Sequence, residues 1–185
     1  MVIYIHGFGG SGEGAKAISF REYFKSRKES FIAPSLSYVP ELAIKTLEEL
    51  IESYEEEVTL IGSSLGGYYT IYLSNKYNLK AVLLNPSIYP YKTLKKYIGD
   101  SPNFYDDSSY KFKQEHIDML NNYIVNDIEK TNFMLLVQMG DELLNPQEAV
   151  DRFKGAKVIA QDGGDHSFKG IELYFDKIRE FLLNK

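Results

Sequence analysis

Residues 60–67 read LIGSSLGG, two adjacent serines between glycines, and they begin inside the apolar run 58–62. That run is short and rich in aliphatic and β-branched residues, which predicts a buried strand. Residues 65–77 then keep a helical spacing of apolar side chains. A buried strand that turns at once into a helix is typical of α/β proteins, so this stretch indicates the fold class.

The rest of the chain continues the alternation of strands and helices. Further apolar runs predict strands at 2–6, 31–33, 81–84, 133–139 and 157–160. Helical spacing predicts helices at 15–26, 40–54, 114–128, 146–153 and 171–182. Strands that are apolar throughout are buried on both faces. We therefore predict a three-layer α/β fold, in which a mostly parallel six-stranded sheet has helices on both faces.

Residues 87–131 interrupt this alternation. They are rich in Tyr, Lys, Asn and Asp, and Pro90, Gly99 and Pro102 break regular structure within them. Their core-forming content is too small for an independent domain. We expect a small cap inserted into a single domain that spans residues 1–185.

The composition excludes several classes of function. The 185 residues carry a net charge of −5 and their Lys and Arg are scattered, which argues against nucleic acid as a partner. Cysteine is absent, so a thiolate nucleophile is excluded, and we expect a cytoplasmic location. No apolar run approaches the roughly 20 residues of a membrane span, and the early strand makes a signal peptide unexpected. The sequence does not indicate the oligomeric state.

The pattern Gly-x-Ser-x-Gly fits residues 62–66 with Ser64 at its centre. In a nucleophile elbow this pattern turns a buried strand into a helix, and the central side chain stands exposed above the sheet. If Ser63 were central, Ile61 and Leu65 would take the glycine positions that let the backbones approach. The register therefore favours Ser64 as a nucleophile. The alternative is a glycine-rich turn without chemistry.

A serine hydroxyl needs a base to become a good nucleophile. His166 follows the last predicted strand and comes after the serine in the chain, as in an α/β hydrolase. Catalytic groups gather at the carboxyl ends of parallel strands. His6 ends the first strand and His116 lies in the insertion, so His166 is the predicted base. The alternative is a solvated loop histidine.

The base in turn needs a carboxylate that holds its tautomer. Asp141 directly follows the predicted strand 133–139 and lies between the serine and the histidine in sequence. Glu142 is the alternative acid. Asp165 is adjacent to His166 and is poorly placed to reach its Nδ1 atom. The alternative for Asp141 is a turn residue after a glycine, which is common.

An oxyanion hole needs backbone N–H donors, which we expect at Leu65, after the nucleophile, and at Phe8, in the loop after the first strand. The same loop, residues 7–12, matches the Gly-x-Gly-x-x-Gly pattern of dinucleotide-binding proteins. The acidic residue that should end the second strand is missing from residues 31–36. Neither a P-loop lysine nor a histidine pair with metal-ligand spacing is present, so we predict no cofactor and no metal.

With these motifs the chain resembles the α/β-hydrolase superfamily, and more closely the small YqiA-like esterases. The matching segments run nearly end to end: YIHGFGGS, LIGSSLGG, LLNPSIYPY, QMGDELL and GGDHSF. The resemblance implies an α/β-hydrolase fold with a catalytic triad of Ser64, Asp141 and His166 and oxyanion donors at Phe8 and Leu65. It also implies hydrolysis of short acyl esters and of acyl-CoA thioesters.

We therefore predict a serine hydrolase that cleaves esters or thioesters of short or medium acyl groups. The alternatives are a hydrolase-like scaffold that binds without turnover and a dinucleotide-dependent enzyme. The aromatic residues of the cap would either line an acyl pocket or only pack the cap on the sheet; they are Tyr89, Tyr91, Tyr97, Phe104, Tyr105, Tyr110 and Phe112.

Overall fold

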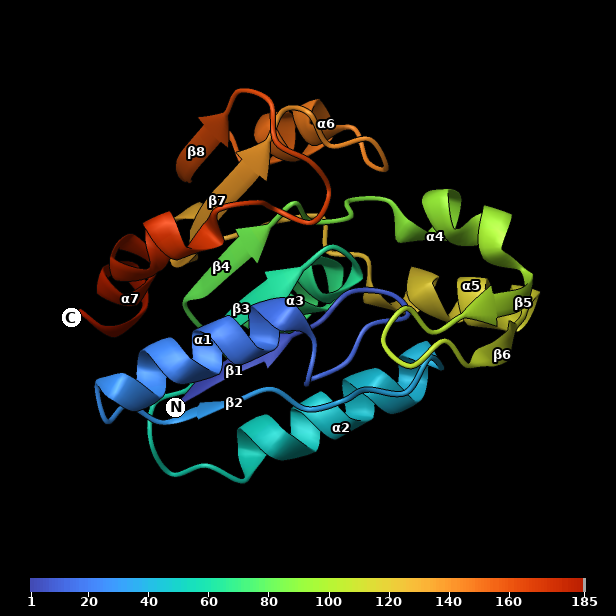
Figure 1. The fold of residues 1–185 in the computed structure, drawn as a ribbon. Coiled ribbons are helices and arrows are strands. Elements are labelled where there is room, and N and C mark those ends of the chain that lie inside the picture. Colours follow the sequence, from blue (N-terminus) through green and yellow to red (C-terminus); the bar gives the residue numbers. More distant parts are fainter. Residues whose placement is uncertain (185) are drawn as a thin grey trace.

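A computed structural model describes residues 1–184 of the chain. Its centre is a six-stranded sheet of order β2-β1-β3-β4-β7-β8, in which every neighbouring pair is parallel (Figure 1). The strands are β1 (Val2–Ile5), β2 (Phe31–Ile32), β3 (Thr59–Ser63), β4 (Ala81–Leu84), β7 (Phe133–Gln138) and β8 (Lys157–Gln161). The predicted six-stranded α/β sheet is confirmed, and β3 lies inside it between β1 and β4.

Helices cover both faces of this sheet (Figure 1). On one face lie α1 (Ala15–Ser26) and α7 (Phe175–Leu183), the second preceded by a 3₁₀ turn, η4 (Ile171–Tyr174). The other face is covered by α2 (Pro40–Glu52), α3 (Leu65–Tyr77) and α6 (Pro146–Arg152). The three layers predicted from the alternation are therefore present.

The strand residues alternate between the two layers. In β1, Val2 and Tyr4 belong to the core under α1 and α7, whereas Ile3 and Ile5 belong to the core under α2 and α3. All four are buried. Because both faces of the strand are covered, the whole run is apolar, and the pattern of alternation is absent from the sequence.

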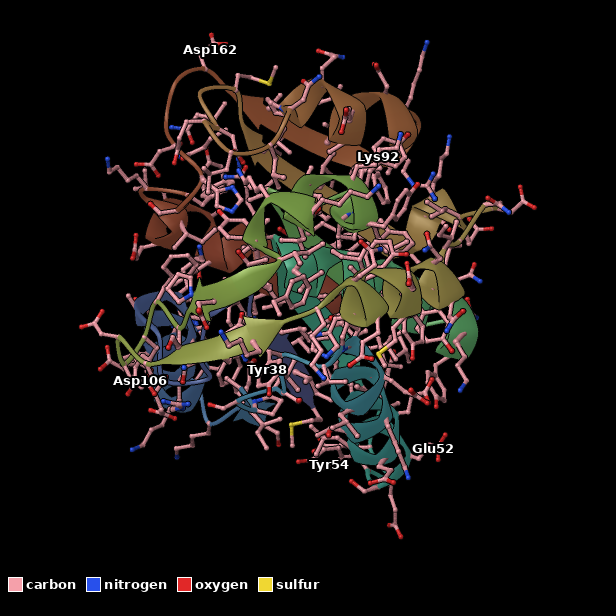
Figure 2. The ribbon with its side chains drawn as sticks, turned by 90° about the vertical axis from the view of Figure 1, so that its right-hand side faces the viewer. Tyr38, Glu52, Tyr54, Lys92, Asp106 and Asp162 are labelled. Atoms are coloured by element: carbon pink, nitrogen blue, oxygen red, sulfur yellow. The ribbon has the colours of Figure 1, made fainter. Side chains whose placement is uncertain are left out.

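Between β4 and β7 the chain forms the expected cap, which Figure 2 shows face on. Its elements are α4 (Pro90–Thr93), η1 (Leu94–Tyr97), β5 (Gly99–Pro102), β6 (Ser109–Phe112), α5 (Gln114–Leu120), η2 (Asn121–Tyr123) and η3 (Lys130–Asn132). Strands β5 and β6 form an antiparallel hairpin with Asp106 at its turn. The ring of Tyr110, in β6, stacks on that of Tyr38 with centroids 4.2 Å apart. The cap is thereby packed onto the segment before α2.

The helix predicted at 114–128 is wrong in its second half. The α-helix ends at Leu120, whose carbonyl accepts a hydrogen bond of 2.7 Å from the Tyr68 hydroxyl. The chain then turns, so that Val125 is buried while Ile124 is 45% exposed. The helical spacing of apolar residues over 114–128 therefore extends beyond the α-helix itself, which ends at Leu120. Among residues 1–184, no helix is long and apolar enough to cross a membrane.

Candidate active site

Ser64 lies on a strained turn between β3 and α3. Its backbone has φ 54° and ψ −119°, a region that a non-glycine residue rarely occupies. Its N–H donates to the Leu84 carbonyl and its own carbonyl accepts from Gly67, which holds this conformation. A Cβ atom on Gly66 would lie 2.1 Å from the Ile5 carbonyl oxygen, so only glycine lets α3 approach β1 this closely.

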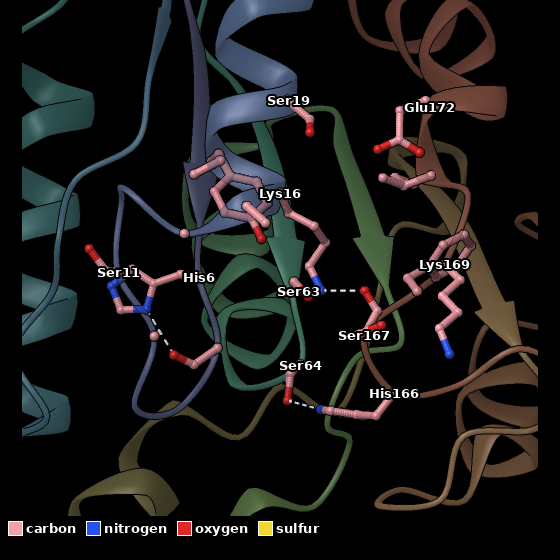
Figure 3. Close-up of a pocket in the computed structure, with 18 of the residues that line it drawn as sticks. His6, Ser11, Lys16, Ser19, Ser63, Ser64, His166, Ser167, Lys169 and Glu172 are labelled. Atoms are coloured by element: carbon pink, nitrogen blue, oxygen red, sulfur yellow. Dashed lines mark hydrogen bonds between the residues drawn. The ribbon is translucent and has the colours of Figure 1, made fainter. Parts of the chain in front are cut away.

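The structure brings Ser64, His166 and Asp141 together. Nε2 of His166 lies 3.0 Å from the Ser64 hydroxyl oxygen (Figure 3), and Nδ1 lies 2.8 Å from an Asp141 carboxylate oxygen. The side chain of Asp141 is 2% exposed and that of His166 is 19% exposed. A hydroxyl, an imidazole and a buried carboxylate joined by hydrogen bonds in this order have the geometry of a Ser-His-Asp triad.

Asp141 has a second set of partners that holds its carboxylate. The oxygen that does not face the imidazole accepts the N–H groups of Leu143 and Leu144, each at 2.9 Å. Burial by itself would raise the pKa of Asp141. The hydrogen bond from His166 and the two N–H groups outweigh it and hold the pKa below its usual value. The group is therefore ionised and oriented toward the imidazole at neutral pH.

The two other acids considered for this role have different partners. Glu142 accepts the backbone N–H of His166 at 3.0 Å and its side chain is otherwise exposed. Asp165 pairs with the Lys169 ammonium at 2.5 Å and accepts from Ser167. Neither carboxylate meets Nδ1 of His166, which favours Asp141 as the orienting acid.

Two buried amides hold the loop that carries His166. Asn85, directly after β4, donates to the carbonyls of Asp165 and His166 and accepts the Gln138 N–H at 2.9 Å. The side chain of Gln138, at the end of β7, accepts the N–H groups of Asp165 and Lys169. The position of the imidazole therefore depends on residues that end two neighbouring strands.

The two expected oxyanion donors belong to segments that adjoin Ser64. Leu65 is the first residue of α3, so its N–H has no carbonyl four residues back within the helix. Phe8 lies in the loop after β1, and that loop is close to Ser64, because a Cβ atom on Gly7 would be 3.0 Å from Ser64 Cβ. In residues 1–184, neither N–H donates to a backbone carbonyl or a side chain. Both are available to an oxyanion.

His6 fixes the loop that carries Phe8. Its Nδ1–H donates to the Gly7 carbonyl at 2.8 Å and its Nε2 accepts the Leu36 N–H at 2.9 Å. Only the neutral imidazole with a proton on Nδ1 makes both bonds. Burial lowers the pKa of His6 below its ordinary value, and the Gly7 bond offsets this only in part.

This arrangement predicts a pH-dependent contribution of His6 to stability. Because the folded pKa is lower than the unfolded one, the unfolded chain binds a proton that the folded chain does not, between the two values. The contribution is complete above pH 6.5 and is lost as the pH falls toward the folded pKa. We expect the unfolding free energy lost in His6→Gln, measured by urea denaturation, to be smaller at pH 5 than at pH 7.5.

The comparison is made between His6→Gln and the wild type at each pH, because His116 titrates as well. Burial also lowers the pKa of His116, whose ring packs on Phe112 and whose Nδ1 accepts the Lys113 N–H. Its contribution is present in both proteins and cancels in the difference. An equal loss at the two pH values would show that His6 is not held neutral by the fold.

A largely apolar cavity of about 400 Å³ opens beside Ser64 under the cap. Of the seven cap aromatics, Tyr97 and Phe104 line it. Phe112 is buried in the core, and Tyr110 packs on Tyr38 and Phe8 instead. Tyr105 is 52% exposed. Both expectations are thus met in part, since Tyr97 and Phe104 line the cavity, whereas Tyr110 and Phe112 pack the cap.

Three residues of the site were missed by the sequence analysis: Asn85, Gln138 and Lys16. Asn85 and Gln138 each end an apolar strand, and a polar residue at that position was the available signal. Lys16 is in the first turn of the helix after the glycine-rich loop, and its side chain enters a second cavity beside Ser64 (Figure 3). No motif distinguished it from the other lysines.

The similarity to known proteins extends over nearly the whole chain. A family model described as Uncharacterised protein family (UPF0227) matches residues 1–183. The "UPF0227 protein YcfP" of Escherichia coli O9:H4 (strain HS) is 23% identical over 195 residues, which cover 98% of each chain.

Similar folds are found among solved structures. Alpha/beta hydrolase domain-containing protein 10 from mouse is 19% identical with a TM-score of 0.77, covering 97% of this chain and 88% of that one. Est1E from Butyrivibrio proteoclasticus, solved with ferulic acid bound, is 14% identical with a TM-score of 0.75. The match covers 98% of this chain and 87% of Est1E. A monoacylglycerol lipase from Paleococcus ferrophilus is 15% identical with a TM-score of 0.68, covering 98% and 93%. At these identities the similarity concerns the fold.

Proposed function

The chain belongs to the UPF0227 family and has the α/β-hydrolase fold, and on this premise we propose that it is a serine hydrolase of carboxylic esters or thioesters. One observation carries the proposal. Ser64, on a strained elbow, is within hydrogen-bond reach of His166, which is in turn bonded to the buried Asp141. A chain of these three groups activates a hydroxyl for attack on an acyl carbonyl.

In the proposed cycle the acyl group is transferred to Ser64 and then to water. Ser64 Oγ attacks the carbonyl carbon while His166 Nε2 accepts its proton, and the oxyanion is bound by the N–H groups of Phe8 and Leu65. The bond to the leaving oxygen or sulfur breaks as His166 returns the proton to it. Water then attacks the acyl-enzyme with His166 as base, and the carboxylic acid leaves as Ser64 recovers its proton.

The cavity under the cap supports an acyl group of short or medium length. It has a volume of about 400 Å³ and includes Ser64 together with Leu94, Tyr97, Leu143 and other apolar side chains. Apolar cavities of this size bind small ligands mainly by removing their surface from water. The cavity is open at Ser64, where the scissile carbonyl must lie.

The contacts of the glycine-rich loop do not support the dinucleotide alternative. Ser35 lies in the segment that follows β2, and its hydroxyl accepts the Gly12 N–H at 3.1 Å and bonds the Ser11 hydroxyl at 3.0 Å. These groups are therefore engaged within the protein. In a dinucleotide-binding loop the backbone N–H groups face a pyrophosphate, and an acid at the end of the second strand binds the ribose.

Labelling with a serine-reactive fluorophosphonate tests the proposal. We expect the wild type to be labelled at Ser64 and to hydrolyse p-nitrophenyl esters, with a panel of acyl lengths and acyl-CoAs giving its preference. Ser64→Ala should abolish both, because the attacking oxygen is removed. Ser63→Ala is the matched control and should keep the label and most of the hydrolysis, since Ser63 belongs to β3 and the imidazole of His166 bonds the Ser64 hydroxyl instead. Well-folded wild-type protein without label would contradict the proposal and favour the non-catalytic scaffold.

A further inference from the structure

A second cavity, of about 420 Å³, also opens at Ser64, and Figure 3 shows residues that line it. It runs between α1 and the segment from His166 to Glu172. Both cavities are lined by Phe8, Ser64, His166 and Ser167. An ester whose carbonyl lies at Ser64 can therefore place one part in each cavity.

The second cavity has more polar groups in its lining than the first, although apolar side chains such as Tyr4, Phe168 and Ile171 line it as well. It includes several hydroxyl groups and the side chain of Lys16, which enters from the first turn of α1; the serines are Ser11, Ser19, Ser63, Ser64 and Ser167. The Lys16 ammonium donates to the Ser167 carbonyl at 2.7 Å. An ammonium has three N–H groups, so this bond leaves capacity for a further acceptor.

Lys16 has no ion-pair partner in the part of the chain that the structure describes, residues 1–184. No carboxylate oxygen there lies within 4 Å of its ammonium, and Asp165 and Asp141 act on it from a greater distance. Burial lowers the pKa of Lys16, and these two carboxylates offset this in part. A half-buried cation without a paired anion is an unusual arrangement, because desolvation is not compensated.

The other charged groups that line this cavity are placed differently. The Lys169 ammonium is paired with Asp165 at 2.5 Å. Glu172 is exposed and lies near Ser19, away from Ser64 (Figure 3). Lys16 is thus the cation of this cavity that is free to meet a ligand near the scissile bond.

We propose that the substrate is an ester or thioester with an apolar group on one side of the scissile bond and a carboxylate on the other, and that Lys16 binds the carboxylate. This inference rests on the proposed function and specifies its substrate class. The apolar part occupies the cavity under the cap, and the anionic part occupies the cavity beside α1. The hydrogen bond from Lys16 to Ser167 places the cation next to His166, so the carboxylate binds within reach of the reacting centre.

The test compares charged esters with neutral esters of the same shape. One pair carries the charge on the leaving group: 4-carboxyphenyl butyrate and 4-carbamoylphenyl butyrate. The other carries it on the acyl group: the mono-p-nitrophenyl ester of adipic acid and its neutral amide. We expect the wild type to prefer the charged member of one pair by about tenfold in kcat/KM, and the pair that shows this identifies the side of the bond that faces Lys16.

Substitutions then assign that preference to Lys16. Lys16→Met should remove it, chiefly through KM, and Lys16→Arg should keep most of it. Lys25→Met is the matched control, an exposed lysine of the same helix that does not line the cavity, and should leave the ratio unchanged. In the wild type the preference should also fall between 20 mM and 500 mM NaCl, which tests the charge interaction without any substitution.

Three results would overturn the inference while the proposed function stands. In the first, the wild type hydrolyses the neutral esters and shows no preference for either charged ester. Alternatively, Lys16→Met would slow charged and neutral esters equally, which would make Lys16 a structural tie between α1 and the His166 loop. A preference lost in Lys96→Met instead would assign the carboxylate to the rim of the apolar cavity, which Lys96 lines. Failure of the proposed function is distinguishable from these three results, because in that case no ester, charged or neutral, would be cleaved.

Discussion

Replacing Asp141 by asparagine should lower kcat for p-nitrophenyl ester hydrolysis by about 10⁴-fold with the fold unchanged. The asparagine keeps an oxygen for the N–H groups of Leu143 and Leu144, so the loop remains in place. Its amide NH₂ faces Nδ1 of His166 and donates to it. The imidazole then carries its proton on Nε2, and this nitrogen no longer accepts the proton of Ser64.

Glu142→Gln is the matched control, because Glu142 is the neighbouring acid and also bonds to the histidine residue. It contacts the backbone N–H of His166, and glutamine retains an oxygen for that bond. We expect a change of less than about tenfold in kcat, since only the charge of an exposed group is removed. Circular dichroism verifies that both variants fold. Activity retained in Asp141→Asn and lost in Glu142→Gln would show that Glu142 is the orienting acid.

Replacing Gly66 by alanine should destabilise the protein by about 3 kcal/mol or more, a large part of the 5–15 kcal/mol of a typical domain. The added Cβ atom would lie 2.1 Å from the Ile5 carbonyl oxygen and 2.5 Å from that of His6. Both are backbone atoms of the central sheet and its first loop, so neither moves without disturbing β1. Urea denaturation measures the loss as a lower midpoint.

Gly14→Ala is the control for this substitution. Gly14 precedes α1 with an ordinary extended backbone, φ −69° and ψ 161°, and an added Cβ atom would lie 3.3 Å from the Ser11 carbonyl oxygen. We expect a change of less than about 1 kcal/mol. If Gly66→Ala is no more destabilising than Gly14→Ala, then α3 is not held against β1 as closely as the structure indicates.

The parts of the fold that were predicted correctly are those whose signal is local. The run 81–84 is recognisable as a buried strand because both of its faces are covered, and β4 has these bounds. The helix 65–77 also has the predicted bounds, since it begins at the elbow and ends at Asn78, which adopts the left-handed conformation typical of a helix end. In both cases the residues that set the boundary are neighbours in sequence.

The cap was predicted less well, because its boundaries depend on distant residues. The end of α5 at Leu120 coincides with a hydrogen bond from Tyr68, which is 52 residues earlier in the chain. The hairpin of β5 and β6 was not foreseen, and its turn is anchored where the Phe104 N–H donates to the Gly9 carbonyl at 2.8 Å. Neither contact leaves a periodic pattern in the sequence.

The sequence alone determined the strands of the central sheet, the helices that alternate with them, and the short list of groups that could do chemistry. Ser64, Asp141 and His166 each follow an apolar strand, and parallel strands bring their carboxyl ends to one edge. The glycine spacing in LIGSSLGG is a local signal, so the elbow was recognisable from the sequence, although distant residues such as Leu84 and Ile5 hold it in place.

Only the tertiary structure decided how these groups are held and what surrounds them. It placed Asp141 rather than Glu142 against the imidazole, set the amides of Asn85 and Gln138 behind the His166 loop, and brought Lys16 into a cavity beside Ser64. The physical reason is that these contacts join segments far apart in the chain. A distance between two side chains depends on the packing of every layer between them, and no local pattern encodes it.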